Sequence, residues 1–231
     1  MCGIIGFVGK EAAAPFLVKG LSNLEYRGYD SAGVATVADG RIWAGKDIGN
    51  LAKVQQKHHL DQLPGKIGIG HVRWATHGGV TPENAHPHFD CKREIAVVHN
   101  GIIENYQELR SQLESKHRFV SETDTEVIPH LIEDYMAAGA SLEEAVLQTI
   151  GQLRGSYALL AISTREPGKI VASRKDSPLV VGRERGRNFV ASDALAFLEQ
   201  TNRVAFVEDG ETVVLARDIA FLDREGKPIE K

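Results

Sequence analysis

The second residue of the chain is a cysteine, and the apolar run 3–8 follows it directly. This run predicts a short buried strand, which would hold Cys2 inside the fold. Methionine aminopeptidases remove Met1 in front of a residue this small, leaving a thiol and a free α-amine on Cys2. The amine, with an ordinary pKa of about 7.7–8.0, and the thiol, at about 8.5, can exchange a proton near neutral pH. Cys2 is therefore a candidate nucleophile with its own base, and the alternative is an accidental cysteine at the start of an ordinary strand.

The chain has 231 residues, of which 42% are hydrophobic and 25% charged, a composition typical of one large globular domain or two small ones. Its net charge of −4 and its lack of a dense Lys/Arg block argue against nucleic acid or a membrane surface as partner. No apolar run approaches the roughly 20 residues of a spanning helix, and a signal peptide is not expected. Cys2 and Cys91 form no disulfide framework, so a reducing cytoplasm is the expected location.

The order of predicted elements indicates an α+β fold. Strands are expected over 34–37, 41–44, 66–72 and 94–98 and repeatedly from 157 to 222, with a hairpin turn at Asp39-Gly40. Helices are expected over 11–24 and through the middle of the chain, where capping boxes at 123–126 and 141–144 mark two helix starts. This order predicts two stacked sheets flanked by helices rather than alternating βαβ units. We expect one domain over 1–231, with the polar residues 223–231 as a tail or the start of a linker.

A polar loop, 71–79, follows one of the predicted strands. Arg73 offers a planar fork that suits a carboxylate and that a lysine cannot match. Thr76 and His77 add hydrogen-bonding groups, and two glycines after them let the loop fold tightly. The alternative is a solvated loop with one interface tryptophan, Trp74. Because loops carry function more often than cores do, we interpret this loop as part of a binding site.

Asn100 and Gly101 come directly after the predicted strand 94–98. A side-chain amide and a glycine N–H at a strand end can form a two-donor oxyanion hole. The alternative is a tight turn, for which Asn-Gly is the commonest dipeptide. A helical pattern follows this strand instead of a partner strand, which weakens the turn interpretation.

Asp124 lies at a predicted helix start. There it can simply complement the helix dipole, a contribution of about 0.3–1 kcal/mol. It can equally bind the α-ammonium group of an amino acid whose α-carboxylate lies on Arg73. The two residues would then form a clamp of opposite charges for an amino acid.

Several histidines raise the question of a metal. The candidates are His86 and His88 in the stretch 84–88, together with His71, His77 and Cys91. Their spacings match no standard zinc pattern, and a metal beside a catalytic thiol would quench it. We therefore expect structural histidines that orient neighbouring loops, no metal and no cofactor.

Six motifs in order resemble the glutaminase domain of glutamine:fructose-6-phosphate amidotransferases, which are class II glutamine amidotransferases and N-terminal-nucleophile hydrolases. The motifs are residues 2–6, 24–33, 73–78, 84–88, 99–105 and 121–127. The resemblance runs from Cys2 to about Leu222. It implies an αββα sandwich that hydrolyses the side-chain amide of L-glutamine to glutamate and ammonia. The residues by themselves do not separate glutamine from asparagine or another amide.

The resemblance also implies a role for each matching residue. Cys2 would be the nucleophile with its α-amine as general base, and Asn100 and the Gly101 N–H would stabilise the oxyanion. The residues implied to hold glutamine are Arg73, Thr76, His77, Gly101 and Asp124. The residues implied to close over or support the site are Trp74, Arg27 and His86. If Met1 is retained, the α-amine of Cys2 is part of a peptide bond and the base is missing.

At full length such proteins continue into an isomerase portion that uses the ammonia to convert fructose-6-phosphate into glucosamine-6-phosphate, with a homodimer as one option. The rival members of the class are the glutaminase domains of phosphoribosylpyrophosphate amidotransferase and asparagine synthetase. The stretches 26–33 and 74–77 favour the glucosamine-6-phosphate type over both. Outside the class, the alternatives are a zinc-binding regulatory module and a catalytically silent relative with the same fold.

Overall fold

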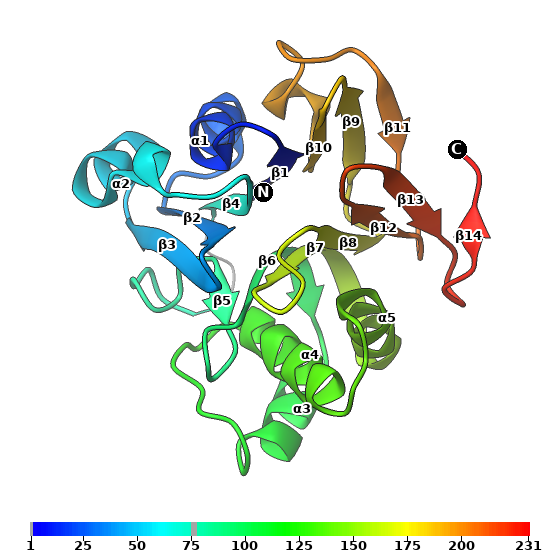
Figure 1. Ribbon diagram of the computed structural model, residues 1–231. Coiled ribbons are helices and arrows are strands. Elements are labelled where there is room, and N and C mark those ends of the chain that lie inside the picture. Colours follow the sequence, from blue (N-terminus) through cyan, green and yellow to red (C-terminus); the bar gives the residue numbers. More distant parts are fainter. Residues whose placement is uncertain (1, 75–77) are drawn as a thin grey trace.

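The computed structural model describes residues 2–74 and 78–231, which form two seven-stranded antiparallel sheets (Figure 1). The first sheet has the order β11-β9-β10-β1-β4-β2-β3. Its strands are β1 (Gly3–Gly9), β2 (Ser31–Ala38), β3 (Arg41–Ile48), β4 (Ile67–Arg73), β9 (Val180–Glu184), β10 (Arg187–Ala191) and β11 (Val204–Phe206). The second sheet has the order β14-β13-β12-β8-β7-β6-β5. Its strands are β5 (His88–Phe89), β6 (Ile95–Ile103), β7 (Gly155–Ser163), β8 (Ile170–Lys175), β12 (Thr212–Leu215), β13 (Ile219–Leu222) and β14 (Pro228–Ile229).

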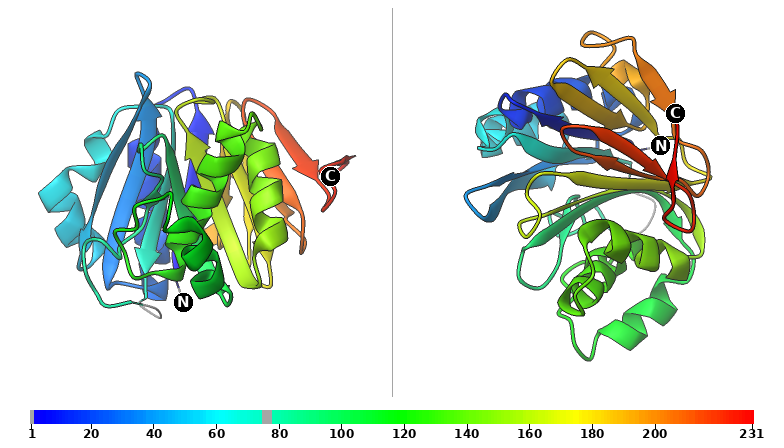
Figure 2. Two further views of the ribbon diagram at one scale, coloured as in Figure 1. Left: turned by 90° about the horizontal axis from the view of Figure 1, so that it is seen from below. Right: turned by 45° about the vertical axis from the view of Figure 1, so that its right-hand side comes forward.

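Helices cover the outer face of each sheet, so the layers run helix, sheet, sheet, helix (Figures 1 and 2). The helices on the first sheet are α1 (Ala13–Leu24) and α2 (Leu51–His58), and those on the second are α3 (Tyr106–Leu113), α4 (Val127–Ala137) and α5 (Leu142–Gln152). Within the described part of the chain, no helix has the length and apolar character needed to cross a bilayer. The predicted αββα arrangement is confirmed.

Strand β1 lies near the middle of the first sheet, between β10 and β4, and both of its faces are buried. Ile4 and Val8 pack into the hydrophobic cluster between the two sheets. Ile5 and Phe7 point the other way, into the cluster beneath α1. This alternation explains why the run after Cys2 is apolar throughout, because a strand with two buried faces needs apolar residues on both. The predicted buried strand is confirmed.

Local turn chemistry accounts for several element boundaries. Asp39 and Gly40 have φ values of 51° and 69°, as a two-residue type I′ hairpin requires, and they join β2 to β3. Ser141 and Glu144 form the predicted capping box at the start of α5. The box predicted at 123–126 is wrong. The Thr123 side chain makes no cap hydrogen bond, and the Glu126 carboxylate instead accepts hydrogen bonds from the backbone of Val120 and Ser121. Residues 124–126 form a 3₁₀ turn, and α4 begins at Val127.

Strand β6 is longer than the sequence indicates. It runs to Ile103 and pairs with β7 along its whole length, including Asn100 with Ala158 and Gly101 with Tyr157. Asn100 and Gly101 therefore lie within a strand rather than beyond its end. Gly101 adopts a φ of 129°, and a Cβ there would lie 2.1 Å from the carbonyl oxygen of Ser156. Glycine is thus required at this position by both conformation and space.

Candidate active site

The thiol of Cys2 lies at the edge of the first sheet where β1 begins and β4 ends. The register pairs Gly3 with Val72, which brings Cys2 to the level of Arg73, the last residue of β4. The Cys2 Sγ accepts a hydrogen bond from the backbone N–H of Trp74 at 3.2 Å and lies 3.4 Å from the Trp74 carbonyl oxygen. Burial raises the pKa of this thiol, so at neutral pH it is protonated and needs a base to become a nucleophile.

Asn100 reaches Cys2 from the other sheet. Its Nδ2 donates to the carbonyl oxygen of Cys2 at 3.0 Å. Its Oδ1 lies 3.1 Å from Nε2 of His71, which is also 3.1 Å from the His99 carbonyl oxygen. Two oxygen neighbours mean that Nε2 carries the hydrogen. Burial lowers the pKa of His71 to about 3, so the ring is neutral and fixes the Asn100 amide with its NH₂ group toward Cys2.

Arg73 and Asp124 face the same small cavity as Cys2. Both side chains are buried, and one Asp124 oxygen accepts a 2.7 Å hydrogen bond from the Ile103 N–H. Burial lowers the pKa of the Arg73 guanidinium, and the nearby Cys2 and Asp124 oppose that shift. The cavity has a volume of about 20 Å³, enough for roughly one water, so an amino acid enters only when the lining moves.

Two of the described histidines, His86 and His99, line the cavity, and His71 packs behind His86. His86 stacks on His71 with ring centroids 4.1 Å apart, and its Nε2 lies 3.1 Å from Oγ1 of Thr125. The same Thr125 hydroxyl lies 2.9 Å from Nδ1 of His99. The loop that carries His86 is held by Lys46, whose Nζ donates to three backbone carbonyls, of Glu83, Ala85 and Pro87. His86 thus supports its neighbours instead of facing solvent, as a structural histidine should.

The turn 25–30 packs against the backbone of Arg73 and Trp74, the segment whose Trp74 N–H donates to the Cys2 thiol. Asp30 N–H donates to the Arg73 carbonyl at 3.0 Å, and a Cβ on Gly28 would lie 2.6 Å from the Arg73 carbonyl carbon. Only glycine lets these two segments approach so closely. Arg27 is anchored to Asp193 by a 2.6 Å hydrogen-bonded ion pair. Trp74 is 46% exposed, and its ring packs edge-on against Tyr29.

Most of the residues singled out in the sequence meet at this one place. The predicted residues that line the cavity are Cys2, Arg73, Trp74, His86, Gly101 and Asp124. Thr76 and His77 lie outside the described residues. Sequence reasoning missed the site roles of His71, His99, Thr123 and Thr125. One signal could have found His71, because it is the polar residue in an otherwise glycine and aliphatic stretch up to Val72.

A larger hollow of about 1540 Å³ lies at the opposite end of β1, where Gly9 and Lys10 contribute to its lining. None of the candidate catalytic or binding residues faces it. The candidate residues therefore gather at the small cavity at the Cys2 end and not at this larger hollow.

Residues 71–199 match the family described as glutamine amidotransferase domain. The chain belongs to this family. The matched region begins at His71 and contains Arg73, Asn100, Gly101 and Asp124, while Cys2 lies before it.

The chain is similar over its full length to particular members. It is 55% identical over 233 residues to the glutamine–fructose-6-phosphate aminotransferase (isomerizing) of Methanothermobacter thermautotrophicus, covering 100% of this chain and 39% of that protein. It is 49% identical to the protein of the same name from Pyrococcus horikoshii, covering 94% of this chain and 37% of that protein. The chain thus spans about two fifths of the length of these curated relatives.

Solved structures show the same architecture. The glutamine phosphoribosylpyrophosphate amidotransferase of B. subtilis, in complex with ADP and GMP, superposes with a TM-score of 0.83 at 29% identity, covering 96% of this chain and 49% of that one. A glutamine aminotransferase class-II domain protein from Silicibacter pomeroyi superposes with a TM-score of 0.67, covering 96% of this chain and 99% of that one. At 17% identity the second likeness concerns the fold alone.

Proposed function

We propose that this chain hydrolyses the side-chain amide of L-glutamine and that it is the ammonia-producing part of a glutamine–fructose-6-phosphate aminotransferase. The observation that carries the proposal is the meeting of Cys2 with Arg73, Gly101 and Asp124 on one cavity. Membership of the glutamine amidotransferase family and the similarity to the aminotransferases support it.

The reaction begins with proton transfer within one residue. After removal of Met1, the α-amine of Cys2 takes the Sγ proton as Sγ attacks the amide carbon of glutamine. The C–S bond forms and the carbonyl oxygen becomes an oxyanion. Asn100 is the first candidate donor to it, since its NH₂ group already points at Cys2, and the backbone N–H of Gly101 is the second.

Collapse of this intermediate breaks the C–N bond. The α-ammonium group of Cys2 returns its proton to the leaving nitrogen, which departs as ammonia. Water then attacks the thioester on Cys2, and the C–S bond breaks to give glutamate and the free thiol. No redox partner is needed, because every step is a transfer of an acyl group or a proton.

The clamp for the amino-acid end of glutamine is formed by Arg73 and Asp124. The Arg73 guanidinium binds the α-carboxylate and the Asp124 carboxylate binds the α-ammonium group, each supplying the opposite charge in a buried setting. Thr76 and His77 add hydrogen bonds to the same end in this proposal, and Trp74 closes over the bound substrate. Arg27 and His86 hold the loops in place without touching glutamine.

The ammonia goes to a sugar-phosphate isomerase portion, which converts fructose-6-phosphate into glucosamine-6-phosphate. In this proposal residues 1–231 are the glutaminase domain, and the segment 223–231 leads toward the isomerase portion. Within this segment, β14 pairs with β13. The full-length protein acts in the cytoplasm, where a catalytic thiol stays reduced, and assembles as a homodimer.

Labelling with 6-diazo-5-oxo-L-norleucine, a glutamine analogue with an electrophilic group, tests the proposal. Intact mass should show a chain without Met1 that gains one adduct, and peptide mapping should place the adduct on Cys2 rather than Cys91. Cys2→Ala is the control and should take no label. A chain that lacks Met1 and still takes no label, or one labelled at Cys91, would contradict the proposal.

A further inference from the structure

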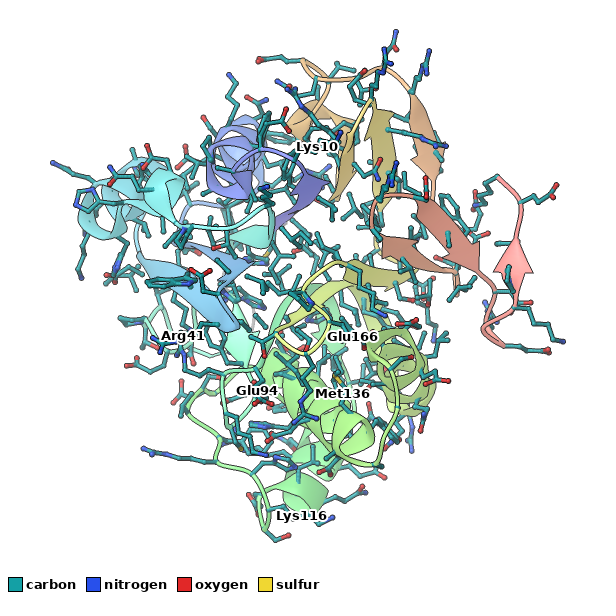
Figure 3. All side chains as sticks on the ribbon, viewed as in Figure 1. Lys10, Arg41, Glu94, Lys116, Met136 and Glu166 are labelled. Carbon is teal, nitrogen blue, oxygen red and sulfur yellow. The ribbon has the colours of Figure 1, made fainter. Side chains whose placement is uncertain are left out.

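Four side chains outside the cavity at Cys2 converge on one point beside helix α4, with Cys91 exposed and the two histidines buried. They are Cys91, His117, His130 and Glu133, and one ligand atom from each lies within 4.8 Å of all the others. Three separate segments bring them together: the turn between β5 and β6, the loop after α3, and one face of α4. Lys116, labelled in Figure 3 at the lower end of the molecule, marks the loop that carries His117.

The distances in this cluster fit a tetrahedral centre. Cys91 Sγ lies 3.5 Å from Nδ1 of His117 and 3.7 Å from Nδ1 of His130. Glu133 Oε2 lies 3.0 Å and 3.5 Å from the same two nitrogens. Zinc bonds of about 2.3 Å to sulfur and about 2.0–2.2 Å to nitrogen and oxygen put tetrahedral ligand atoms about 3.4–3.6 Å apart. Four of the six ligand-atom distances lie near these values and all six are within 4.8 Å, so the same four atoms can reach one zinc ion after the side chains adjust.

The groups behind the ligands also match a metal site. The far nitrogen of His117, Nε2, lies 3.1 Å from Asp134 Oδ1, whereas Nε2 of His130 has no hydrogen-bond partner among the described residues and lies 3.9 Å from the Glu126 carboxylate. Metal-bound histidines usually have a hydrogen-bonded carboxylate behind them, as His117 has, which fixes the ring and leaves the near nitrogen for the metal. Cys91 Sγ accepts a hydrogen bond from the Arg118 N–H at 3.4 Å. This contact would stabilise a thiolate ligand.

The alternative is a metal-free network in which the Glu133 carboxylate accepts hydrogen bonds from both imidazole rings. Such a network gives the thiol of Cys91 no purpose, because a thiol is a weak hydrogen-bonding group. It does account for the direction of Nδ1 in both rings, because Glu133 Oε2 lies 3.0 Å and 3.5 Å from these two nitrogens. Zinc explains the thiol and both ring orientations together, since Cys, His and carboxylate are its usual ligands.

We propose that Cys91, His117, His130 and Glu133 bind one Zn²⁺ ion. The protein supplies all four ligands, so the site is structural and not catalytic. It ties the β5–β6 turn and the loop after α3 to helix α4. Beside it, the Glu126 carboxylate holds the backbone of Val120 and Ser121 on the approach to Asp124, so the ion stiffens the support of the substrate clamp.

Cobalt(II) titration tests the site, in protein carrying Cys2→Ala so that Cys91 is the one remaining thiol. We expect one equivalent of Co²⁺ with the intense visible bands of tetrahedral cobalt and a thiolate charge-transfer band, and displacement of the cobalt by Zn²⁺. Zn²⁺ should also raise the Tm. The readouts need no glutamine, so they stand apart from the test of glutamine hydrolysis.

Matched variants decide the outcome. Cys91→Ser changes one atom of a surface side chain, and it should remove the charge-transfer band and the Tm shift while the circular dichroism spectrum stays unchanged. Asp134→Asn should weaken metal binding about 10- to 100-fold. His59→Gln, at an exposed histidine, is the control and should bind metal as before. No tetrahedral cobalt spectrum, or a charge-transfer band that survives Cys91→Ser, would overturn the proposal.

Discussion

The side-chain amide of Asn100 donates a 3.0 Å hydrogen bond to the carbonyl oxygen of Cys2. Asn100 belongs to β6 of the second sheet, and Cys2 immediately precedes β1 of the first. The proposed nucleophile and the proposed oxyanion donor therefore come from opposite layers of the sandwich. The site depends on how the two sheets are packed, and changes at either layer should affect catalysis.

Replacing Asn100 by Ala should lower kcat for glutamine hydrolysis by about 10²–10³, with little change in KM. The reason is that the lost donor is needed for the oxyanion and not for substrate binding. Steady-state kinetics on the purified variant measures this. Asn23→Ala, at a surface asparagine bonded to the Leu195 carbonyl, is the control and should keep both constants. Equal kcat in the two variants would show that Asn100 does not stabilise the oxyanion.

Asp124→Asn should raise KM for glutamine, because the substrate ammonium group would lose a buried opposite charge. The loss should correspond to about 2–5 kcal/mol of binding free energy. Asparagine keeps an oxygen for the Ile103 N–H, so the fold is preserved and the effect reports charge. Asp61→Asn, at an exposed position, is the matched control. An unchanged KM in Asp124→Asn would reject the clamp.

Gly28→Ala should lower kcat/KM through its contact with Arg73. The added methyl group would lie 2.6 Å from the Arg73 carbonyl carbon and would push away the backbone that contacts Cys2. Overpacking of this kind typically costs about 1–3 kcal/mol of folding free energy. Gly151→Ala is the control, because no atom lies within 4 Å of that Cβ and alanine favours its helix. Urea denaturation and kinetics together separate lost stability from lost positioning.

The protein should lose stability as the pH falls from 7 to 5, because its site histidines are buried in their neutral form. Burial lowers the pKa of His71 to about 3 and lowers the pKa of His86 and His88 well below its ordinary value. In this pH window the unfolded chain binds protons that the folded chain does not. Each histidine therefore contributes a slope of up to about 1.4 kcal/mol per pH unit below 6.5.

Urea denaturation at pH 7, 6 and 5 measures this slope. His71→Gln removes one titrating group and should reduce the slope, although the substitution itself costs stability at pH 7. Asn23→Ala, at a surface residue that does not titrate, should leave the slope unchanged. Stability that stays constant between pH 7 and 5 would contradict the neutral state of these rings.

Much of the fold could be predicted because its signals are local. The apolar run after Cys2, the Asp39-Gly40 turn and the Ser141 capping box each act within a few residues, and each is confirmed. The extent of β6 could not be predicted, because its last residues are held by pairing with β7 and by Asp124, whose contact with Ile103 crosses 21 positions.

The same limit applies to the polar residues. The sequence groups Cys91 with His86 and His88, but the structure places His88 against Thr123 and brings Cys91 to His117. Distance along the chain carries no information about such contacts when three segments meet only in the folded state. That Arg73 and Asp124 share one cavity was easier to predict, because an amino acid carries two opposite charges and needs a partner for each.

Chain ends normally fray first, since few contacts hold them. Here the residue proposed to react adjoins β1, and both faces of β1 are part of hydrophobic clusters. Exchange of the β1 amide hydrogens with solvent should therefore require near-global opening and should be among the slowest in the molecule. The reactive end of the protein is then among the last parts to melt. Loss of glutaminase activity on heating should accordingly coincide with loss of the fold and not precede it.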